Sequence, residues 1–279
     1  MIRERVTVPS IRNSKVRLGH EPISMITAYD FPGARMVDQA GADMILVGDS
    51  LAMVVLGHKD TLSVTIDDMV HHTKAVAAAD PLALIVTDMP WMSYHTGTKD
   101  AVVGASKLIR AGASAVKIEG GAIRAKVIKA IVEAEIPVVG HLGLTPQSVN
   151  KFGGFRVQAK SNEQAQALLE DAKTVEAAGA FCLVLEAIPD VVAKAVTNTL
   201  SIPTIGIGAG AQCDGQVLVF HDILGYGSKK PPKFVKRYAN LEELGIEGLA
   251  RYVKDVRTGH FPDDTQTYHD SDGVISKLY

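Results

Sequence analysis

Four short, mostly apolar runs in this chain end abruptly on an acidic residue. They cover residues 45–49, 84–88, 116–119 and 183–186, and their last residues are Asp49, Asp88, Glu119 and Glu186. An apolar run of this length is typical of a strand buried in a parallel sheet, and the carboxyl ends of such strands open onto a ligand crevice. Acids far apart in the sequence can meet there, and crowded carboxylates repel one another unless a proton or a cation lies between them. The pattern therefore predicts a divalent-metal site.

Strand and helix signals alternate along the whole chain. Strands are expected at residues 23–28, 43–47, 82–87, 115–118, 138–142, 181–185, 204–207 and 216–220, and helices at 32–40, 67–79, 100–110, 122–134, 162–178, 189–197 and 241–256. The alternation predicts a single-domain α/β protein with the fold of a (β/α)8 TIM barrel. An open doubly wound sheet is the alternative, because the sequence does not show whether the sheet closes.

The length and composition suit one compact domain. A barrel of this kind has about 250 residues, and the chain has 279, of which 47% are hydrophobic and 22% charged. We expect residues 1–279 to form a single barrel domain with an N-terminal extension at about 1–20 and a polar C-terminal tail at about 262–279.

The charge and the cysteines indicate the kind of partner and the compartment. A net charge of −2 offers no broad basic surface, so nucleic acid is not an expected partner. No apolar run is long enough to cross a membrane, so no membrane association is expected either. Cys182 and Cys213 lie in or beside apolar segments without metal-ligand spacing, which favours buried thiols. We expect a cytoplasmic protein with a small ligand; a mitochondrial protein that has lost its targeting peptide is the alternative.

Each acid also has a purely structural interpretation. Asp49 stands before Ser50 and could cap a helix or belong to a turn, and Asp88 could open a turn before a proline. Glu119 is more informative, because Lys117 precedes it by two residues and the period of a strand points both side chains to the same face. A structural ion pair between Lys117 and Glu119 is the alternative to a functional role.

Taken together, the acids favour a catalytic metal site. Asp49, Asp88 and Glu119 end the second, third and fourth expected strands, so they share one sector of the barrel mouth. Glu186 faces them from the sixth strand. Oxygen ligands of this kind suit Mg²⁺. His141 ends the fifth strand at the same mouth, either as a substrate contact or as a hydrogen-bonded structural residue.

Two other features carry alternatives of their own. His71 and His72 lie on an expected helix, and we expect them on its outer face because no further histidine stands at ligand spacing. The glycine-rich segment 206–210 follows the seventh strand, where barrels often hold phosphate on backbone N–H groups.

Several motifs resemble those of the ketopantoate hydroxymethyltransferase family. The matching segments are 48–57, 87–90, 117–121, 140–147, 153–158 and 206–218, and the resemblance runs in order from about residue 23 to 226. It implies a (β/α)8 barrel enzyme of pantothenate biosynthesis that uses Mg²⁺. Such an enzyme transfers a hydroxymethyl group from 5,10-methylenetetrahydrofolate to 3-methyl-2-oxobutanoate, giving 2-dehydropantoate and tetrahydrofolate. The resemblance also implies a homo-oligomer, with a decamer as the expected assembly.

The resemblance and the strand-end pattern together give roles to residues at the barrel mouth. The expected metal ligands are Asp49, Asp88 and Glu119; the expected substrate-binding residues are Asp49, Ser50, Asp88, Lys117 and His141; the expected catalytic base is Glu186. The C3 proton of a 2-oxo acid is too weakly acidic for a carboxylate to remove unless the developing enolate is stabilised, which Mg²⁺ would do as a Lewis acid. Glu186, on the opposite wall, would then take the proton.

The segment 145–161 is long for a loop between a strand and a helix, and Gly153-Gly154 would serve as its hinge. We expect it to close over the site, with aromatic and basic side chains that meet the folate, namely Phe152, Phe155, Lys151 and Arg156. A surface loop used in subunit packing is the alternative. Trp91-Met92 stands where the family usually has an aromatic residue followed by glycine, which affects the expected folate contacts.

Two rival functions come from different classes of protein. A carbon–carbon lyase of the phosphoenolpyruvate mutase and isocitrate lyase kind would use a similar 2-oxo acid, but its catalytic-cysteine loop is missing here. Cys182 lies within an expected strand and Cys213 follows another. A barrel that binds its ligand without turnover would be expected to have lost a mouth acid or Lys117, and all of these are present.

Overall fold

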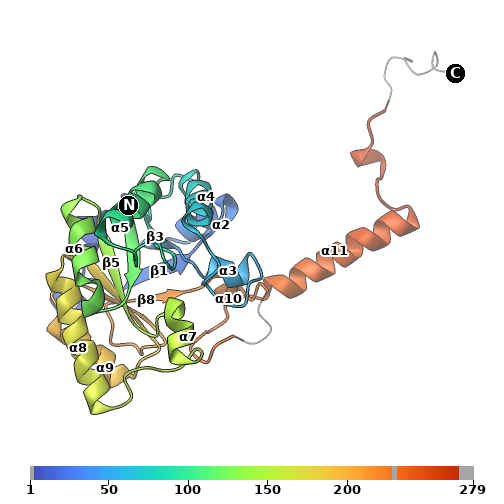
Figure 1. The fold of residues 1–279 in the computed structure, drawn as a ribbon. Helices are drawn as coiled ribbons and strands as arrows, with labels where there is room; N and C mark the ends of the chain where they lie inside the picture. The colour runs from blue at the N-terminus through green and yellow to red at the C-terminus, as the bar shows by residue number, and fades with distance from the viewer. Residues whose placement is uncertain (1–2, 228–230, 270–279) are drawn as a thin grey trace.

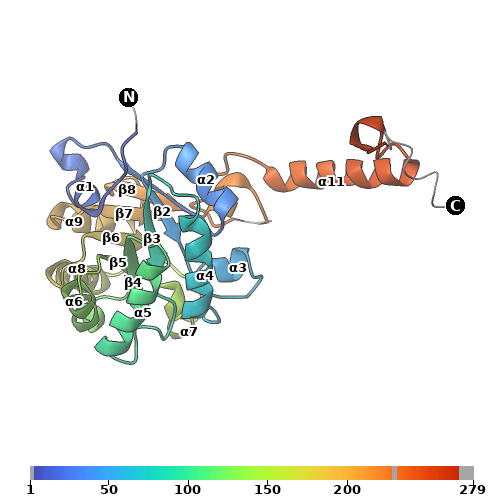
Figure 2. The same ribbon diagram turned by 90° about the horizontal axis from the view of Figure 1, so that it is seen from above.

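The protein is built around a closed barrel of eight parallel strands (Figures 1 and 2). The computed structural model describes residues 3–227 and 231–269. The strands are β1 (Ile23–Thr27), β2 (Met44–Val47), β3 (Leu84–Asp88), β4 (Ala115–Glu119), β5 (Val138–Gly143), β6 (Cys182–Glu186), β7 (Thr204–Ile207) and β8 (Gly215–Leu218). They pair in sequence order, and β1 pairs with β8. The closed ring confirms the predicted (β/α)8 barrel and excludes the open doubly wound sheet.

Six helices cover the outside of the barrel (Figure 2). They are α2 (Phe31–Gln39), α4 (Ile66–Ala77), α5 (Thr98–Arg110), α6 (Ala125–Glu133), α8 (Asn162–Ala177) and α9 (Asp190–Thr199). Local sequence fixes where several of them begin, because a side-chain oxygen that accepts from the first-turn N–H groups stabilises a helix start. Thr65 and Ser161 form capping boxes before α4 and α8, and Asp30 caps α2.

Two layers of apolar side chains hold the barrel together. One lies between the sheet and the surrounding helices. The other fills the barrel interior and includes alternate residues of single strands, such as Leu84 and Val86 on β3 and Cys182 and Val184 on β6. This alternation follows from the period of two in a strand. It also means that a polar residue two positions further along points into the barrel at its carboxyl end.

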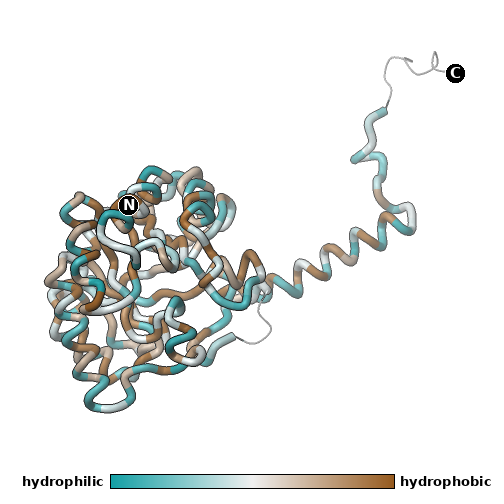
Figure 3. Tube along the Cα trace, viewed as in Figure 1, coloured by the Kyte–Doolittle hydropathy of each residue, from teal (hydrophilic) through white to brown (hydrophobic). Residues whose placement is uncertain are grey.

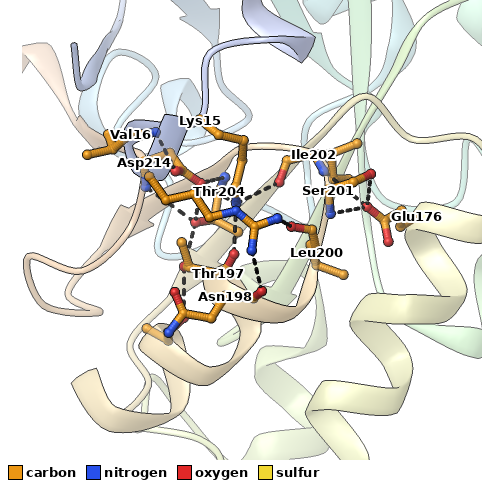
Figure 4. Close-up of polar contacts among 12 residues, drawn as sticks. Lys15, Val16, Glu176, Thr197, Asn198, Leu200, Ser201, Ile202, Thr204 and Asp214 are labelled. Atoms are coloured by element: carbon orange, nitrogen blue, oxygen red, sulfur yellow. Dashed lines mark hydrogen bonds and ion pairs between the residues drawn. The ribbon is translucent and has the colours of Figure 1, made fainter. Parts of the chain in front are cut away.

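The N-terminal segment closes the opposite end of the barrel. It contains α1 (Val8–Arg12) and the 3₁₀ helix η1 (Val16–Leu18), and Ile11 packs into the interior cluster. Between them, the buried Lys15 donates from Nζ to Asp214 Oδ2 (2.7 Å), Thr197 O (2.8 Å) and Ile202 O (3.1 Å), as Figure 4 shows. Asp214, directly before β8, also accepts from the backbone N–H of η1. The charge pair therefore ties the N-terminal segment to the last strands.

Some local predictions were wrong in detail. The eighth strand ends at Leu218 and not at residue 220, because Phe220 begins the short helix α10 (Phe220–Leu224) and donates its N–H to Thr27 Oγ1 (2.9 Å). The expected loop after β2 contains α3 (Leu51–Val54). The segment 145–161 is not a plain loop, since it folds into the 3₁₀ helix η3 (Pro146–Ser148) and α7 (Val149–Phe152).

The last helix, α11 (Leu241–Thr258), projects away from the barrel (Figures 1 and 2). None of its residues is buried. Figure 3 shows hydrophobic and hydrophilic positions interleaved along it. It is followed by the 3₁₀ helix η4 (Asp264–Gln266), so the expected polar tail is structured in part, and residues 270–279 of that tail lie outside the described residues. Across residues 3–227 and 231–269, no helix is both long and apolar enough to cross a membrane.

Candidate functional site at the barrel mouth

The inward-facing rows of four neighbouring strands end on polar residues. On β3, Asp88 continues the row of Leu84 and Val86, and on β4 Lys117 and Glu119 continue the row of Ala115. His141 on β5 and Glu186 on β6 follow in the same way after Val139 and Val184. The side chain of Glu186 is 15% exposed, and the other four polar side chains are at most 5% exposed. The sheet therefore collects all five predicted strand residues in one largely buried cluster.

Asp49 and Ser50 reach the same cluster from a tight turn after β2. Gly48 permits the turn, because a Cβ at this position would lie 2.8 Å from Ser50 Oγ and 3.5 Å from Asp88 Oδ2. The backbone N–H of Asp49 donates to Asp88 Oδ2 (3.0 Å), which holds the two acids side by side. Ser50 Oγ lies 2.9 Å from the hydroxyl of the buried Tyr29. Asp49 does not cap α3, so this structural interpretation is wrong.

Lys117 is the cation of the cluster. Its Nζ lies 2.9 Å from Asp88 Oδ1 and 3.0 Å from His141 Nδ1. Burial alone would lower the pKa of Lys117, but the charges of Asp88, Glu119 and Asp49 outweigh burial and raise it. Lys117 therefore stays charged, and the partner in its ion pair is Asp88. The alternative of a structural ion pair with Glu119 is not found within the described part of the chain.

His141 connects Lys117 to Glu186. An ammonium group can only donate, so His141 Nδ1 accepts from Lys117 and the ring proton is on Nε2. Nε2 lies 3.2 Å from Glu186 Oε2. Burial and the positive charge of Lys117 lower the pKa of His141, although Glu186 opposes this shift. A neutral histidine thus stands between the fixed cation and the carboxylate of Glu186.

The cluster contains more carboxyl groups than cationic groups. Burial, with the neighbouring charges of Asp88 and Glu119, raises the pKa of the Asp49 carboxyl well above its usual range. Burial likewise raises the pKa of Glu119 to about 7, with Lys117 opposing and Asp88 adding to the shift. Three carboxyl groups therefore share the single ammonium group of Lys117, and the raised pKa values mean that protons neutralise part of their charge in the metal-free protein. A divalent cation would relieve this imbalance.

The oxygen atoms present fit such a cation. No three His, Cys, Asp or Glu side chains in residues 3–227 and 231–269 form a metal site by themselves. Mg²⁺ does not require one, because one or two carboxylates usually hold it together with water and substrate oxygens. Asp49 and Asp88 lie side by side, and Glu119 Oε1 is buried without a hydrogen-bond partner in the described structure. The donor set is hard and oxygen-rich, as Mg²⁺ prefers.

Glu119 predicts an unusual pH dependence of stability. Its pKa in the folded, metal-free protein is about 7, against an ordinary value of 4.5. Folding therefore favours the protonated form of Glu119. The contribution of this residue to the free energy of unfolding is fully present below about pH 4.5 and is lost as the pH rises through about 7. We expect the melting temperature in EDTA to fall between about pH 4.5 and 7, and to fall less in Glu119→Gln. Equal slopes for the two proteins would contradict this pKa.

Gln147 was missed as a site residue, although it lies in a motif already noted. Its backbone N–H donates to Glu119 Oε2 (2.9 Å), and its side chain donates to Asp49 Oδ2 (2.8 Å) and Met89 O (2.9 Å). Tyr94 in turn donates to Gln147 Oε1 (2.6 Å). A neutral amide in a loop has neither charge nor periodicity to mark it. The proline that starts η3 one residue earlier is the nearest local signal.

Gln147 belongs to the segment 145–161, which therefore begins beside the cluster. Gly153 and Gly154 have φ values of 66° and 118°, in the left-handed region that glycine adopts easily. Phe155 is exposed, and the backbone N–H of Gln158 donates to Ala187 O (2.9 Å), next to Glu186. The segment is therefore fixed at both ends beside the cluster, with its glycines and Phe155 between.

Met92 has a backbone conformation that would suit the glycine expected at its position from the resemblance. Its φ is 69°, a left-handed conformation that is strained for a bulky residue. Trp91 and Met92 are both more than 40% exposed. This chain therefore has a left-handed backbone at residue 92, as a glycine would, but with a large apolar side chain.

The other two sequence features have structural roles. His71 is exposed as expected, but His72 is half-buried, and its Nδ1 lies 2.7 Å from Tyr29 O. In the glycine-rich segment, Gly208 has a φ of 62°, and a Cβ there would lie 2.7 Å from the ring of Phe234. This glycine is needed for close packing, independently of any phosphate.

Comparison with known proteins identifies relatives over the whole barrel. A family model described as ketopantoate hydroxymethyltransferase matches residues 5–264. A protein named 3-methyl-2-oxobutanoate hydroxymethyltransferase from Clostridium novyi (strain NT) is 53% identical over 266 residues, covering 95% of this chain and 97% of its own. A protein of the same name from Syntrophomonas wolfei subsp. wolfei is 52% identical over 276 residues and covers 99% of both chains.

Solved structures support the fold. A phosphonopyruvate hydrolase has a TM-score of 0.60 at 12% identity, with 97% of this chain and 94% of that chain covered. A 2,3-dimethylmalate lyase of the phosphoenolpyruvate mutase and isocitrate lyase superfamily has a TM-score of 0.60 at 18% identity, with 94% and 92% covered. At this level of identity the likeness concerns the barrel alone. These structures therefore support a shared fold with the rival lyases, but they do not support a lyase function for this chain.

Proposed function

Since this chain belongs to the ketopantoate hydroxymethyltransferase family, we propose that it transfers a hydroxymethyl group from 5,10-methylenetetrahydrofolate to 3-methyl-2-oxobutanoate. The products would be 2-dehydropantoate and tetrahydrofolate. The chain is an enzyme, a transferase. The main support is the line of contacts that crosses the mouth from Asp88 through Lys117 and His141 to Glu186.

One side of the mouth is suited to hold the 2-oxo acid. Asp49, Asp88 and Glu119 would hold Mg²⁺, which when bound supplies the positive charge that stabilises the enolate form of the substrate. Lys117 presents a permanent ammonium group that can bind a substrate carboxylate oxygen. Ser50, oriented by Tyr29, can donate its hydroxyl proton to the same oxygen. His141, beside Lys117, can contact the substrate as well.

Glu186 is suited to act as the base. It lies on β6, with His141 between it and the expected metal ligand Glu119 on β4, and its side chain is the most exposed of the strand-end cluster. A carboxylate there can accept the C3 proton of the substrate. The neutral His141 keeps the positive charge of Lys117 out of direct contact with it. Substrate would thus be held by one wall and deprotonated from the other.

Deuterium exchange tests this proposal without the folate step. Wild-type protein incubated with 3-methyl-2-oxobutanoate in D₂O should exchange the C3 proton when Mg²⁺ is added, and EDTA should stop the exchange. Mass spectrometry or NMR of the recovered acid gives the rate. Exchange that persists after exhaustive chelation would contradict the metal, and no exchange under any condition would contradict the deprotonation step.

The role of Lys117 can be separated from its contribution to stability. If its ammonium group binds the substrate carboxylate, Lys117→Met should weaken 2-oxo acid binding by about 2–5 kcal/mol, because one partner of a desolvated charge pair is lost. Titration calorimetry in saturating Mg²⁺ gives the affinity. Lys129→Met, on the exposed face of α6, is the matched control. Unchanged affinity with a large fall in melting temperature would make Lys117 a scaffold residue.

The folate co-substrate would enter between two segments beside the mouth. The segment 145–161 offers Phe152 and Phe155 for a planar ring and Lys151 and Arg156 for carboxylates. Trp91 and Met92 present exposed apolar surface in the loop after β3. We place the folate contacts on these two segments.

We also propose that the protein is a homo-oligomer, with a decamer as the expected assembly. The support is α11, on which Ile246, Leu249, Val253 and Val256 recur every three or four residues and are 42–68% exposed. Such a stripe is typical of a helix face that packs against another surface. We propose that the surface packed against it belongs to a second copy of the chain.

Cys182 and Cys213 are free and buried, as is usual in the cytoplasm, which we propose as the compartment.

A further inference from the structure

Gln147 connects two acids that come from different strands. Its side chain and its backbone N–H reach Asp49 after β2 and Glu119 on β4, while Gln147 itself belongs to η3 after β5. The residue is buried. It is the only described residue that donates hydrogen bonds to both Asp49 and Glu119.

Tyr94 decides which way the amide of Gln147 points. Both groups that face Nε2, Asp49 Oδ2 and Met89 O, are acceptors only, so Nε2 must supply both protons. Oε1 faces the Tyr94 hydroxyl at 2.6 Å, which donates to it. The hydroxyl in turn accepts from the backbone N–H of Glu119 (3.3 Å). A flipped amide would turn its oxygen toward the carboxylate of Asp49, which is unfavourable.

These bonds divide the oxygens of each carboxylate into two kinds. Asp49 Oδ2 and Glu119 Oε2 are each bound by Gln147. Glu119 Oε1 lies 3.4 Å from His141 Nδ1 but has no hydrogen-bond partner among the described residues, and no described residue donates to Asp49 Oδ1. One oxygen of each acid is therefore held, and the other is left for a ligand.

We propose that Gln147 is a positioning residue that orients Asp49 and Glu119 for a divalent cation, and that Tyr94 acts through it by fixing its amide. The inference rests on the proposed function, because it assumes that these acids bind Mg²⁺. Residues that hydrogen-bond to metal ligands fix the orientation of those ligands, and their loss typically costs about 10–100-fold in metal affinity. Gln147 differs from the acids themselves in that it adds no charge to the site.

Metal binding to the substrate-free protein tests the inference. Gln147→Met keeps the length of the side chain and the backbone N–H but removes both side-chain donors. We expect about 10–100-fold weaker binding of Mn²⁺ and Mg²⁺ by titration calorimetry, at a temperature well below the melting transition. Gln166→Met makes the same change on the exposed face of α8 and should bind as the wild type does.

Tyr94→Phe provides a second and independent measurement. It leaves Gln147 in place but frees its amide, so metal binding should weaken less than in Gln147→Met. The double variant should bind metal no more weakly than Gln147→Met, because both changes act through one amide. This readout remains available if Gln147→Met does not fold.

The outcomes separate the inference from the proposed function. Wild-type affinity in Tyr94→Phe and in a folded Gln147→Met would overturn the inference and leave the metal site intact. A lower melting temperature with unchanged metal affinity would have the same meaning, since it shows a purely structural role. Failure of the wild type itself to bind either cation would overturn the proposed function and the inference with it.

Discussion

Glu186→Gln is expected to reduce deuterium exchange at C3 of 3-methyl-2-oxobutanoate by at least about 10²–10⁴-fold, the usual contribution of a general base. The amide has the shape of the carboxylate but cannot accept the proton at neutral pH. Glu186 is not among the expected metal ligands, so Mg²⁺ and substrate should bind within about tenfold of the wild-type affinities. The exchange rate and the two affinities are measured on the same preparation.

The control for this variant is a surface glutamate. Glu170→Gln makes the same chemical change on α8, where the side chain contacts only solvent-exposed neighbours, and should leave exchange at the native rate. Native exchange in Glu186→Gln would remove this residue from the mechanism. Loss of substrate affinity together with exchange would instead assign it to binding.

Lys15→Met is expected to destabilise the protein by about 3–5 kcal/mol, because it leaves the carboxylate of Asp214 buried without its counter-charge. Both side chains are at most 2% exposed, so water cannot replace the lost partner. The loss corresponds to roughly 10 °C in melting temperature for a chain of this size. Thermal unfolding followed by circular dichroism measures it.

The same variant should leave catalysis intact when it is folded. Lys15 lies at the amino ends of β7 and β8, opposite the mouth that carries Glu186. Deuterium exchange at low temperature should therefore match the wild type. Lys173→Met, which breaks an exposed pair with Glu170, should change stability by less than about 1 kcal/mol. A wild-type melting temperature in Lys15→Met would show that Asp214 finds another partner.

Much of the fold could be predicted because the barrel repeats one simple unit. Buried parallel strands show as apolar runs, and helix starts such as Thr65 and Ser161 carry capping residues. The period of two correctly placed Lys117 and Glu119 on one face. Closure of the ring could not be predicted, because it depends on β1 pairing with β8 and no local pattern encodes that contact.

The candidate site was predictable where charge marked it and unpredictable where it did not. The strand-end acids stood out against apolar neighbours, and the structure brings them together. The partner of Lys117 proved to be Asp88, its register partner on the adjacent strand β3, since pairing between strands sets which side chains meet. Gln147 escaped notice because its importance comes from three hydrogen bonds to groups distant in sequence.

The seam between β8 and β1 has a consequence for how the chain folds. The ion pair between Lys15 and Asp214 joins residues 199 positions apart. It stabilises the same junction between the two ends of the chain as the pairing of β1 with β8. Contacts between such distant residues form late, because the cost of closing the chain must be met first. During synthesis, the nascent chain would hold seven strands with an unpaired edge until β8 has left the ribosome. Chaperone dependence of expression should therefore be concentrated in this final stage, when an open sheet is exposed to other chains.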